Sequence, residues 1–100
     1  MAFVSLVREG KVSDGHRSVH RYQGRVLLLL QVDGRRYLCD ARCPHRGVLM
    51  SAGRVEKGRL RCPGHGLHFD LETGENIEGL CAPMMRLPLV HAAGQIGFDG

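Results

Sequence analysis

Hydrophobic residues along this chain fall in short runs that are separated by glycine, proline and aspartate, a pattern typical of β-strands and turns. The strongest run, Val26–Val32, is continuous rather than alternating, so it predicts a strand that is buried on both faces. Asp33-Gly34 follows this run, and both residues tolerate the positive φ angles of a type I′ hairpin turn. The chain is then expected to return as a partner strand over residues 36–39.

The remaining runs repeat this alternation of strand and turn. Helix is expected to be scarce, because no segment of about ten residues keeps a 3.6-residue apolar period without a glycine or proline. We therefore expect an all-β fold, a small antiparallel sandwich or barrel that residues 1–100 form as a single domain. Further strands are predicted at residues 3–7, 18–22, 54–56, 59–61, 68–71, 87–91 and 95–98, with turns at 57–58, 73–74 and 93–94.

The charge pattern is typical of a solvated surface rather than of nucleic-acid binding. The sequence carries 14 lysines and arginines against 10 aspartates and glutamates, a net charge of +4. A basic domain can bind nucleic acid, but here the arginines are scattered, and an aromatic content of 5% offers no stacking platform. No apolar run approaches the roughly 18 residues of a membrane span, and the first residues do not resemble a signal peptide. We expect a cytoplasmic protein that binds neither nucleic acid nor membrane.

Candidate metal ligands occur in two short motifs, Cys43-Pro44-His45 and Cys62-Pro63-Gly64-His65. Each motif offers one thiolate and one imidazole on a turn that contains proline. This arrangement suits a centre in which cysteine holds one metal and histidine a second, which is the ligation of a Rieske [2Fe–2S] cluster. Zinc accepts the same ligand types, although zinc fingers usually pair cysteine with cysteine and histidine with histidine. Spacing alone leaves both metals open.

Proline and glycine favour the cluster over zinc. Pro44 and Pro63 fix φ and stiffen each loop. Gly47 and Gly66 follow the histidines, and glycine lets backbone N–H groups approach inorganic sulfide closely. Hydrogen bonds to sulfur stabilise an added electron and tune the reduction potential.

The other two cysteines are not expected to be ligands. Cys39 lies in a strand-like stretch and is interpreted as a small buried apolar side chain. Cys81 lies in a loop near Pro83, where it could approach the metal centre. Four cysteines also allow two disulfides, but a reducing compartment disfavours them.

The two motifs, with the residues around them, resemble the Rieske family. Cys43–Gly47 and Cys62–Gly66 resemble its two ligand boxes, Phe69–Glu75 its following strand and turn, and Pro83–Pro88 its proline-containing loop. The resemblance covers about residues 3–98. It implies a Rieske-like fold with one [2Fe–2S] cluster per chain, whose cluster-binding part, about residues 40–85, is made of two hairpin loops. It also implies that Cys43 and Cys62 bind the inner iron, and that His45 and His65 bind the outer iron near the surface.

Departures from the respiratory branch of the family indicate a ferredoxin. The positions of its inter-loop disulfide hold Val48 and Gly64, and the positions of its serine and tyrosine donors hold Leu67 and Phe69. Fewer hydrogen bonds to sulfur predict a reduction potential near the low end of the Rieske range, about −150 mV. The ferredoxin branch often carries tryptophan in its second box, and this chain has none.

The function that the resemblance implies is that of a one-electron carrier, not an enzyme. It would accept an electron from a flavin-containing reductase and pass it to a terminal oxygenase of the aromatic-ring-hydroxylating type, through transient contacts and as a monomer. Two alternatives stay open: a small Rieske subunit of a nitrite reductase-like complex, and a redox sensor. An apolar rim for docking is expected from Val48, Leu49, Met50, Gly64, Leu67, Pro83 and Met84, and Arg42 and Arg46 could meet an acidic partner.

Overall fold

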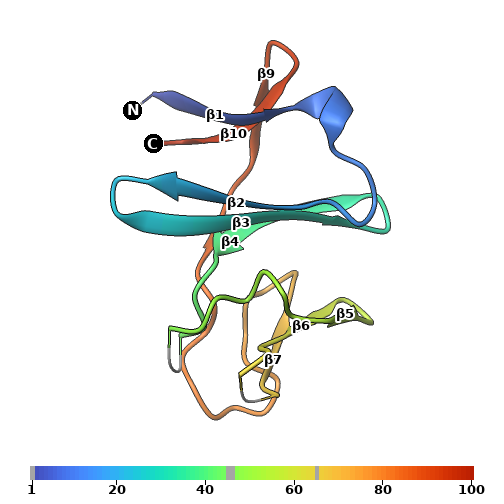
Figure 1. Ribbon diagram of the computed structural model, residues 1–100, viewed down its shortest axis with the longest axis vertical. Helices are drawn as coiled ribbons and strands as arrows, with labels where there is room; N and C mark the ends of the chain where they lie inside the picture. The colour runs from blue at the N-terminus through green and yellow to red at the C-terminus, as the bar shows by residue number, and fades with distance from the viewer. Residues whose placement is uncertain (1, 45–46, 65) are drawn as a thin grey trace.

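Three small antiparallel sheets make up the computed structural model, which describes residues 2–44, 47–64 and 66–100 (Figure 1). The sheets have the strand orders β1-β10-β9, β2-β3-β4-β8 and β5-β6-β7. This arrangement confirms the all-β antiparallel fold expected from the sequence. The elements are β1 (Phe3–Arg8), the short 3₁₀ helix η1 (Glu9–Lys11), β2 (Arg17–Tyr22), β3 (Arg25–Val32), β4 (Arg35–Asp40), β5 (Val55–Glu56), β6 (Arg59–Arg61), β7 (His68–Asp70), β8 (Arg86–Leu87), β9 (Val90–Ala92) and β10 (Gln95–Asp99). In the described ranges, no helix has the length and apolarity to cross a membrane.

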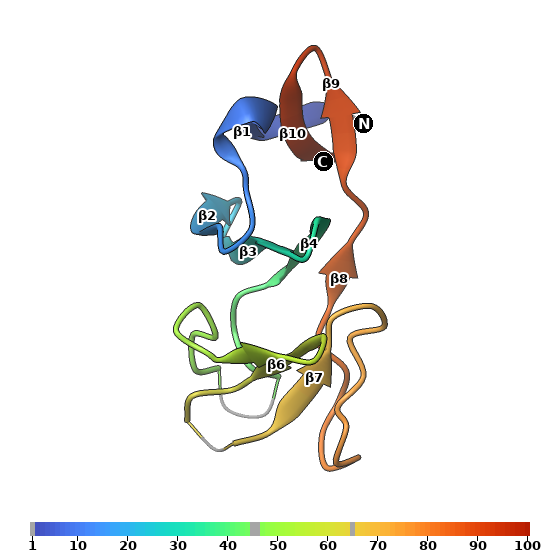
Figure 2. The same ribbon diagram turned by 90° about the vertical axis from the view of Figure 1, so that its right-hand side faces the viewer.

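Strand β3 separates two hydrophobic cores, as the layers in Figure 2 suggest. Leu27 and Leu29 face a core shared with the β1-β10-β9 sheet, where they join Ile96 and Phe98. The alternate residues of β3, Leu28 among them, face the opposite core, which contains the ligand-loop cysteines. A strand with a core on each side needs apolar side chains on both faces. This explains why the run is continuous, and it confirms the prediction of two-sided burial.

Hairpin turns follow the predicted chemistry. Asp33 and Gly34 both have positive φ, 49° and 78°, between β3 and β4. Lys57-Gly58 and Ala93-Gly94 repeat this pair of positive angles in the β5–β6 and β9–β10 connections. Glycine in the second position accepts the left-handed conformation without a Cβ clash.

The prediction of one strand over residues 87–91 is wrong. Strand β8 pairs with β4, where Leu87 lies opposite Leu38, whereas β9 pairs with β10, where Val90 lies opposite Gly97. Pro88 lies between them and has no N–H to donate to a ladder. The chain therefore leaves one sheet at this proline and enters another.

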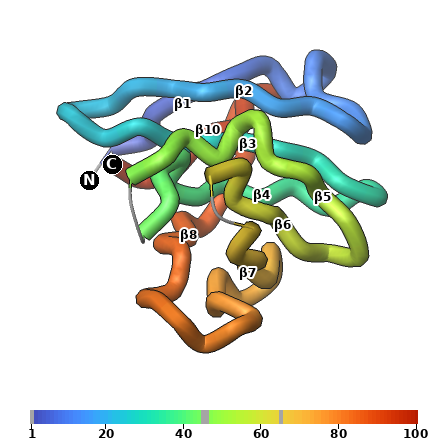
Figure 3. The backbone as a smooth tube through the Cα atoms, turned by 60° about the horizontal axis from the view of Figure 1, so that its bottom comes forward, coloured from blue at the N-terminus to red at the C-terminus, as the bar shows by residue number. Residues whose placement is uncertain are grey.

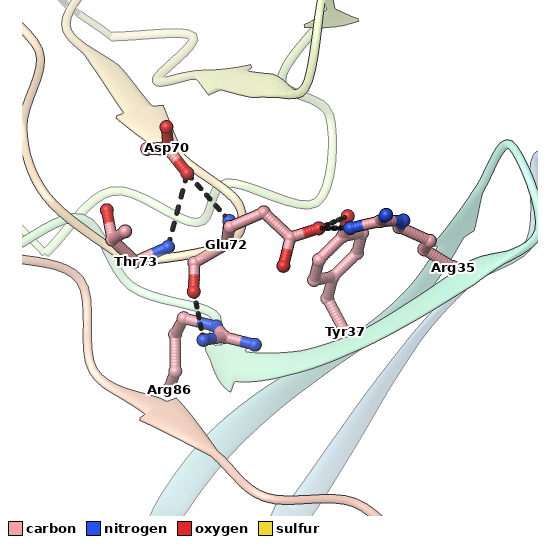
Figure 4. A network of polar contacts seen from close by, with 6 residues as sticks. All are labelled: Arg35, Tyr37, Asp70, Glu72, Thr73 and Arg86. Atoms are coloured by element: carbon pink, nitrogen blue, oxygen red, sulfur yellow. Dashed lines mark hydrogen bonds and ion pairs between the residues drawn. The ribbon is translucent and has the colours of Figure 1, made fainter.

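A polar network around Glu72 ties the middle sheet to the turn after β7 (Figure 4). Tyr37 Oη and Arg35 Nη1 from β4 both donate to Glu72 Oε1 at 2.6 Å. Arg86 Nη1 donates to the carbonyl oxygen of Glu72. Asp70 Oδ1 accepts from the backbone N–H of Glu72 at 2.8 Å and shapes the turn itself. The network holds the third sheet, which carries one ligand loop, against β4.

Candidate metal centre

The two cysteine loops have the same backbone frame. The N–H of Cys43 donates to the carbonyl of Val48, and the N–H of Gly47 donates back to the carbonyl of Cys43, both at 2.7 Å. In the second loop, the N–H of Cys62 donates to Leu67 at 2.7 Å, and the N–H of Gly66 donates to Cys62 at 3.1 Å. Each cysteine thus bonds with the residues four and five positions after it. The equivalence is not obvious from the sequence, because the histidine lies two residues after the cysteine in one loop and three in the other.

Each loop is closed by a glycine in the left-handed region. Gly47 and Gly66 both have a φ of 72°, which L side chains rarely adopt. Their own N–H groups donate to the cysteine carbonyls. The N–H groups of the glycines themselves are used in closing the loops, and the approach of other backbone N–H groups to sulfide stays a prediction.

Both loops lie at the ends of strand pairs, as predicted. Arg42 and Leu49 form an antiparallel bridge at the base of the first loop. The second loop joins β6 to β7, which pair from Arg59–Asp70 to Arg61–His68. In Figure 1 both loops lie below β2, β3 and β4, and in Figure 3, where the bottom of that view comes forward, they lie in front of β3 and β4. Local strand pairing therefore fixes the position of the backbone at each cysteine, which is the first residue of its loop.

The two candidate cysteine ligands are buried and the two candidate histidine ligands fall outside the described residues. Cys43 is 2% exposed and Cys62 is 0% exposed, and both belong to the core beneath β3. His45 and His65, with Arg46, are not among the residues that the structure describes. Assignment of the four ligands therefore stays a prediction, to which the structure adds the equivalent placement of the two cysteines.

The other cysteines have different surroundings. Cys39 on β4 is fully buried, burial raises the pKa of its thiol to about 12, and its Sγ donates to the carbonyl of Leu28 at 3.8 Å. Cys81 is half-buried and packs against the same core as Cys43; burial, then the neighbouring Cys43 and Glu78, raise its pKa. Among the described residues, Cys39, Cys43 and Cys81 form no disulfide, in agreement with the expectation that the four cysteines are not paired as two disulfides.

Apolar residues meet between the loops. A Cβ placed on Gly64 would lie 3.2 Å from a Val48 methyl carbon, so the two positions that correspond to a disulfide in the respiratory branch are neighbours. Leu67 is 8% and Phe69 0% exposed. The two side chains that replace hydroxyl donors are thus buried hydrocarbon, which excludes water from the second loop.

The predicted apolar rim is only partly correct. Leu49 is 40% exposed, Val48 is half-buried, and Gly64 and Pro83 are exposed. Met50, Leu67 and Met84 instead fill the core and cannot contact a partner. Sequence pattern could not separate the two sets, because each consists of apolar loop residues, and only the folded chain shows which of them point inward.

Comparisons with known proteins agree with this geometry. The family model of the Rieske [2Fe-2S] domain matches residues 2–88. The chain is 32% identical over 82 residues to the ferredoxin component of the 2,4-dinitrotoluene dioxygenase system of Burkholderia sp. (strain RASC), covering 82% of this chain and 76% of that protein. It is 39% identical over 62 residues to the ferredoxin component of the naphthalene 1,2-dioxygenase system of Pseudomonas putida, covering 62% of this chain and 57% of that protein.

Two further similarities show how widely the domain occurs. A 45-residue segment is 51% identical to the oxygenase subunit of 3-chlorobenzoate-3,4-dioxygenase of Comamonas testosteroni, of which the chain spans only 9%. Among solved structures, the Sphingomonas yanoikuyae B1 ferredoxin superposes with a TM-score of 0.87, at 25% sequence identity and 99% coverage of both chains. The domain thus occurs both in small carriers and inside larger proteins.

Proposed function

Because the chain belongs to the Rieske [2Fe–2S] domain family, we propose that it is a one-electron carrier, the ferredoxin component of an aromatic-ring-hydroxylating oxygenase system. It accepts an electron from a flavin-containing reductase and delivers it to a terminal oxygenase. The bound [2Fe–2S] cluster supplies reversible storage of one electron. The protein supplies the ligands, the surroundings that set the potential, and the docking face.

The donor set of this chain fits that cofactor. Two buried cysteines, Cys43 and Cys62, occupy the same position in two equivalent loops. In our assignment they hold the inner iron, and His45 and His65 hold the outer iron. The equivalence of the loops is the observation that carries the proposal, because in this assignment each iron takes one ligand from each loop.

The loops also suit rapid electron exchange. Each is closed by two backbone hydrogen bonds and contains a proline that fixes one φ angle. A ligand shell that is held in this way rearranges little between oxidation states, which lowers the barrier to exchange. Leu67 and Phe69 offer no hydrogen bond to sulfur, so we place the midpoint potential near −150 mV.

The relatives support the carrier role. The proteins that match over most of their length are named as ferredoxin components of dioxygenase systems. We infer that this chain acts as a monomer in the cytoplasm and forms transient complexes with both partners. Co-purification with a larger reductase at fixed stoichiometry would instead favour the alternative of a nitrite reductase-like subunit.

The test is direct reduction of an oxygenase. Anaerobically reduced protein is mixed in a stopped-flow instrument with the purified oxygenase encoded beside it, and reoxidation of the cluster is followed by absorbance. We expect reoxidation coupled to reduction of the oxygenase, with hydroxylated product when substrate and oxygen are added. A Cys39→Ala variant serves as the control that keeps the chromophore. The carrier role is contradicted if the reductase does not reduce the protein and the oxygenase does not reoxidise it.

A further inference from the structure

We propose that Arg42 and Arg61 turn the face around the two ligand loops into a docking surface for a protein partner whose own contact surface is acidic around an apolar centre. This proposal rests on the proposed function, since it names the chemistry of the partner at the same site. Its basis is a pair of arginines that the two loops position in equivalent ways.

The pair is visible in the sequence once the loops are aligned by their hydrogen bonds. Arg42 immediately precedes Cys43 and Arg61 immediately precedes Cys62, and a proline follows the cysteine in both loops. Each loop therefore carries an arginine, a cysteine and a proline in the same order. Because the two loops share one backbone frame, the arginines leave the frame at equivalent points.

Each guanidinium group lies near the closing glycine of its own loop, but on a different side of it. Arg42 Nη1 donates to the carbonyl oxygen of Gly47 at 3.2 Å. In the second loop, a Cβ placed on Gly66 would lie 3.1 Å from Arg61 Nη2. Arg42 thus binds the carbonyl side of Gly47, whereas Arg61 lies over the Cα of Gly66, the residue that follows His65 in the sequence. Both arginines are exposed, so the charges stay accessible to a partner.

These two positive charges are not balanced by ion pairs. Among the described residues, neither arginine forms a salt bridge, whereas nearby carboxylates do have partners. Asp40, which lines the same surface hollow as Arg42 and Cys43, is paired with Arg25 at 2.9 Å. Glu78, which raises the pKa of Cys81, is bound to His68 at 2.6 Å. The loops therefore present two arginines without ion pairs to described residues, beside an Asp40 that is already paired with another arginine.

Apolar groups lie beside Arg42 and where the two loops touch. Leu49, the bridge partner of Arg42, is 40% exposed, and Val48 meets Gly64 where the loops touch. Complementary charge around a small apolar centre steers a partner into register and allows it to leave again. Nucleic acid is the other common polyanion, but this surface shows no aromatic platform among its described residues. We therefore assign the surface to an acidic protein.

Small redox reagents of opposite charge test the proposal without requiring an identified partner. The reduced protein is oxidised by ferricyanide, an anion, and separately by hexaamminecobalt(III), a cation, over a range of ionic strength. The variant pair R42Q/R61Q is compared with R8Q/K11Q, which removes the same net charge from β1 and η1 at the opposite end of the molecule (Figure 1). Midpoint potentials of all three proteins are measured by voltammetry.

We expect R42Q/R61Q to slow oxidation by the anion roughly five-fold and to speed oxidation by the cation, with both effects fading at high salt. R8Q/K11Q should change either rate by less than about two-fold. A shift in potential would move both rates in one direction, so opposite changes identify local charge as the cause. Equal effects of the two double variants, or none, would overturn the proposal, as would loss of single-stranded oligonucleotide binding on R42Q/R61Q substitution.

Failure here is separable from failure of the proposed function. A protein that reduces its oxygenase as well after R42Q/R61Q substitution as before, at low salt, retains the carrier role and loses the acidic-partner assignment. If the protein reduces no oxygenase, but R42Q/R61Q still changes the rates with ferricyanide and hexaamminecobalt(III) in opposite directions, the basic surface is supported and the carrier role is contradicted.

Discussion

The molecule has two regions that are held together in different ways. The base consists of the sheets β1-β10-β9 and β2-β3-β4-β8, and the loop region consists of the β5-β6-β7 sheet and the two ligand loops. In the base, β3 pairs along its length with β2 and β4, and it buries apolar residues on both faces. In the loop region, β5, β6 and β7 are only two or three residues long. Short strands contribute few ladder bonds, so that region depends on packing against β3 and β4 and on contacts between loops.

The loop region is attached to the base through a shared core and a polar network. Glu72 gathers donors from β4 and β8, and Phe69, Leu60 and Leu71 fill the core below β3. From this difference we expect the base to be stable through its own burial and strand pairing, and the loop region to gain additional stability when a metal centre binds. Four experiments, given from the largest expected effect to the smallest, test that contrast.

Removal of the cluster should affect the two regions unequally. We expect the apo form to lose amide-exchange protection in β6, β7 and both loops, while β3 and β4 keep theirs, because a metal centre stabilises only the state that ligates it. Hydrogen exchange followed by mass spectrometry compares the holo and apo proteins. Uniform loss of protection in both regions would show that the base is not independent of the metal.

Cavities in the two cores should separate stability from cluster binding. Leu29→Ala opens a cavity in the core between β3 and the β1-β10-β9 sheet. It should lower the free energy of unfolding by about 2–5 kcal/mol, while the visible spectrum is retained. Phe69→Ala, in the core that contains Cys43 and Cys62, should lower the free energy of unfolding by about 3–5 kcal/mol and also weaken cluster retention. Denaturant unfolding and absorbance measure the two effects. If Leu29→Ala releases the cluster as readily as Phe69→Ala, the cores are not separate.

Loss of the Tyr37 hydroxyl should loosen the attachment of the loop region. Tyr37→Phe removes the donor to Glu72 and should lower stability by about 1 kcal/mol. Hydrogen bonds from Tyr37, then from Arg35, lower the pKa of Glu72. The stabilisation that ionised Glu72 gives is therefore present above the ordinary carboxyl pKa. It is lost as the pH falls through the lowered pKa of Glu72 in the folded protein. Stability in Tyr37→Phe should depend less on acidic pH than in the parent; an unchanged slope would contradict the assignment.

The hydrogen bonds between Glu78 and His68, in the loop after β7, should persist in acid down to about pH 2. Hydrogen bonds from the backbone and ring of His68 lower the pKa of Glu78 to about 2. The contact stabilises the fold above the unfolded carboxyl pKa and is lost as the pH falls toward 2. We expect the protection of the His68 amide, relative to its intrinsic exchange rate, to fall only near that pH, and to be low at all pH values in Glu78→Ala, which removes the acceptor. Loss of this protection in the parent already near pH 4 would contradict this.

Much of the base could be predicted from the sequence, because its signals are local. The continuous run 26–32 and the turn Asp33-Gly34 fix one hairpin through burial and backbone angles alone. The exchange of sheets at Pro88 could not be read from periodicity, since residues 86–92 look like one strand until their partners are known. Long-range pairing decides such cases.

In the candidate site, ligand chemistry was readable and side-chain placement was not. Cysteine and histidine spacing indicated a metal site, and the residues around the two motifs indicated the cluster, which the family match supports. The burial of Met50 and Met84, and the fold-back of Arg61 over Gly66, depend on contacts between distant segments. One signal was available: the repeated Arg-Cys-Pro triplet, which marks the equivalence of the loops, was present in the sequence.

Electron paramagnetic resonance of the dithionite-reduced protein tests the central claim most directly, namely that Cys43, Cys62, His45 and His65 together hold one [2Fe–2S] cluster. We predict a rhombic signal whose average g value lies below that of clusters with four cysteine ligands, and its disappearance in Cys43→Ala and Cys62→Ala but not in Cys39→Ala. A colourless protein that contains zinc, or a reduced signal with the higher average g of all-sulfur ligation, would contradict it.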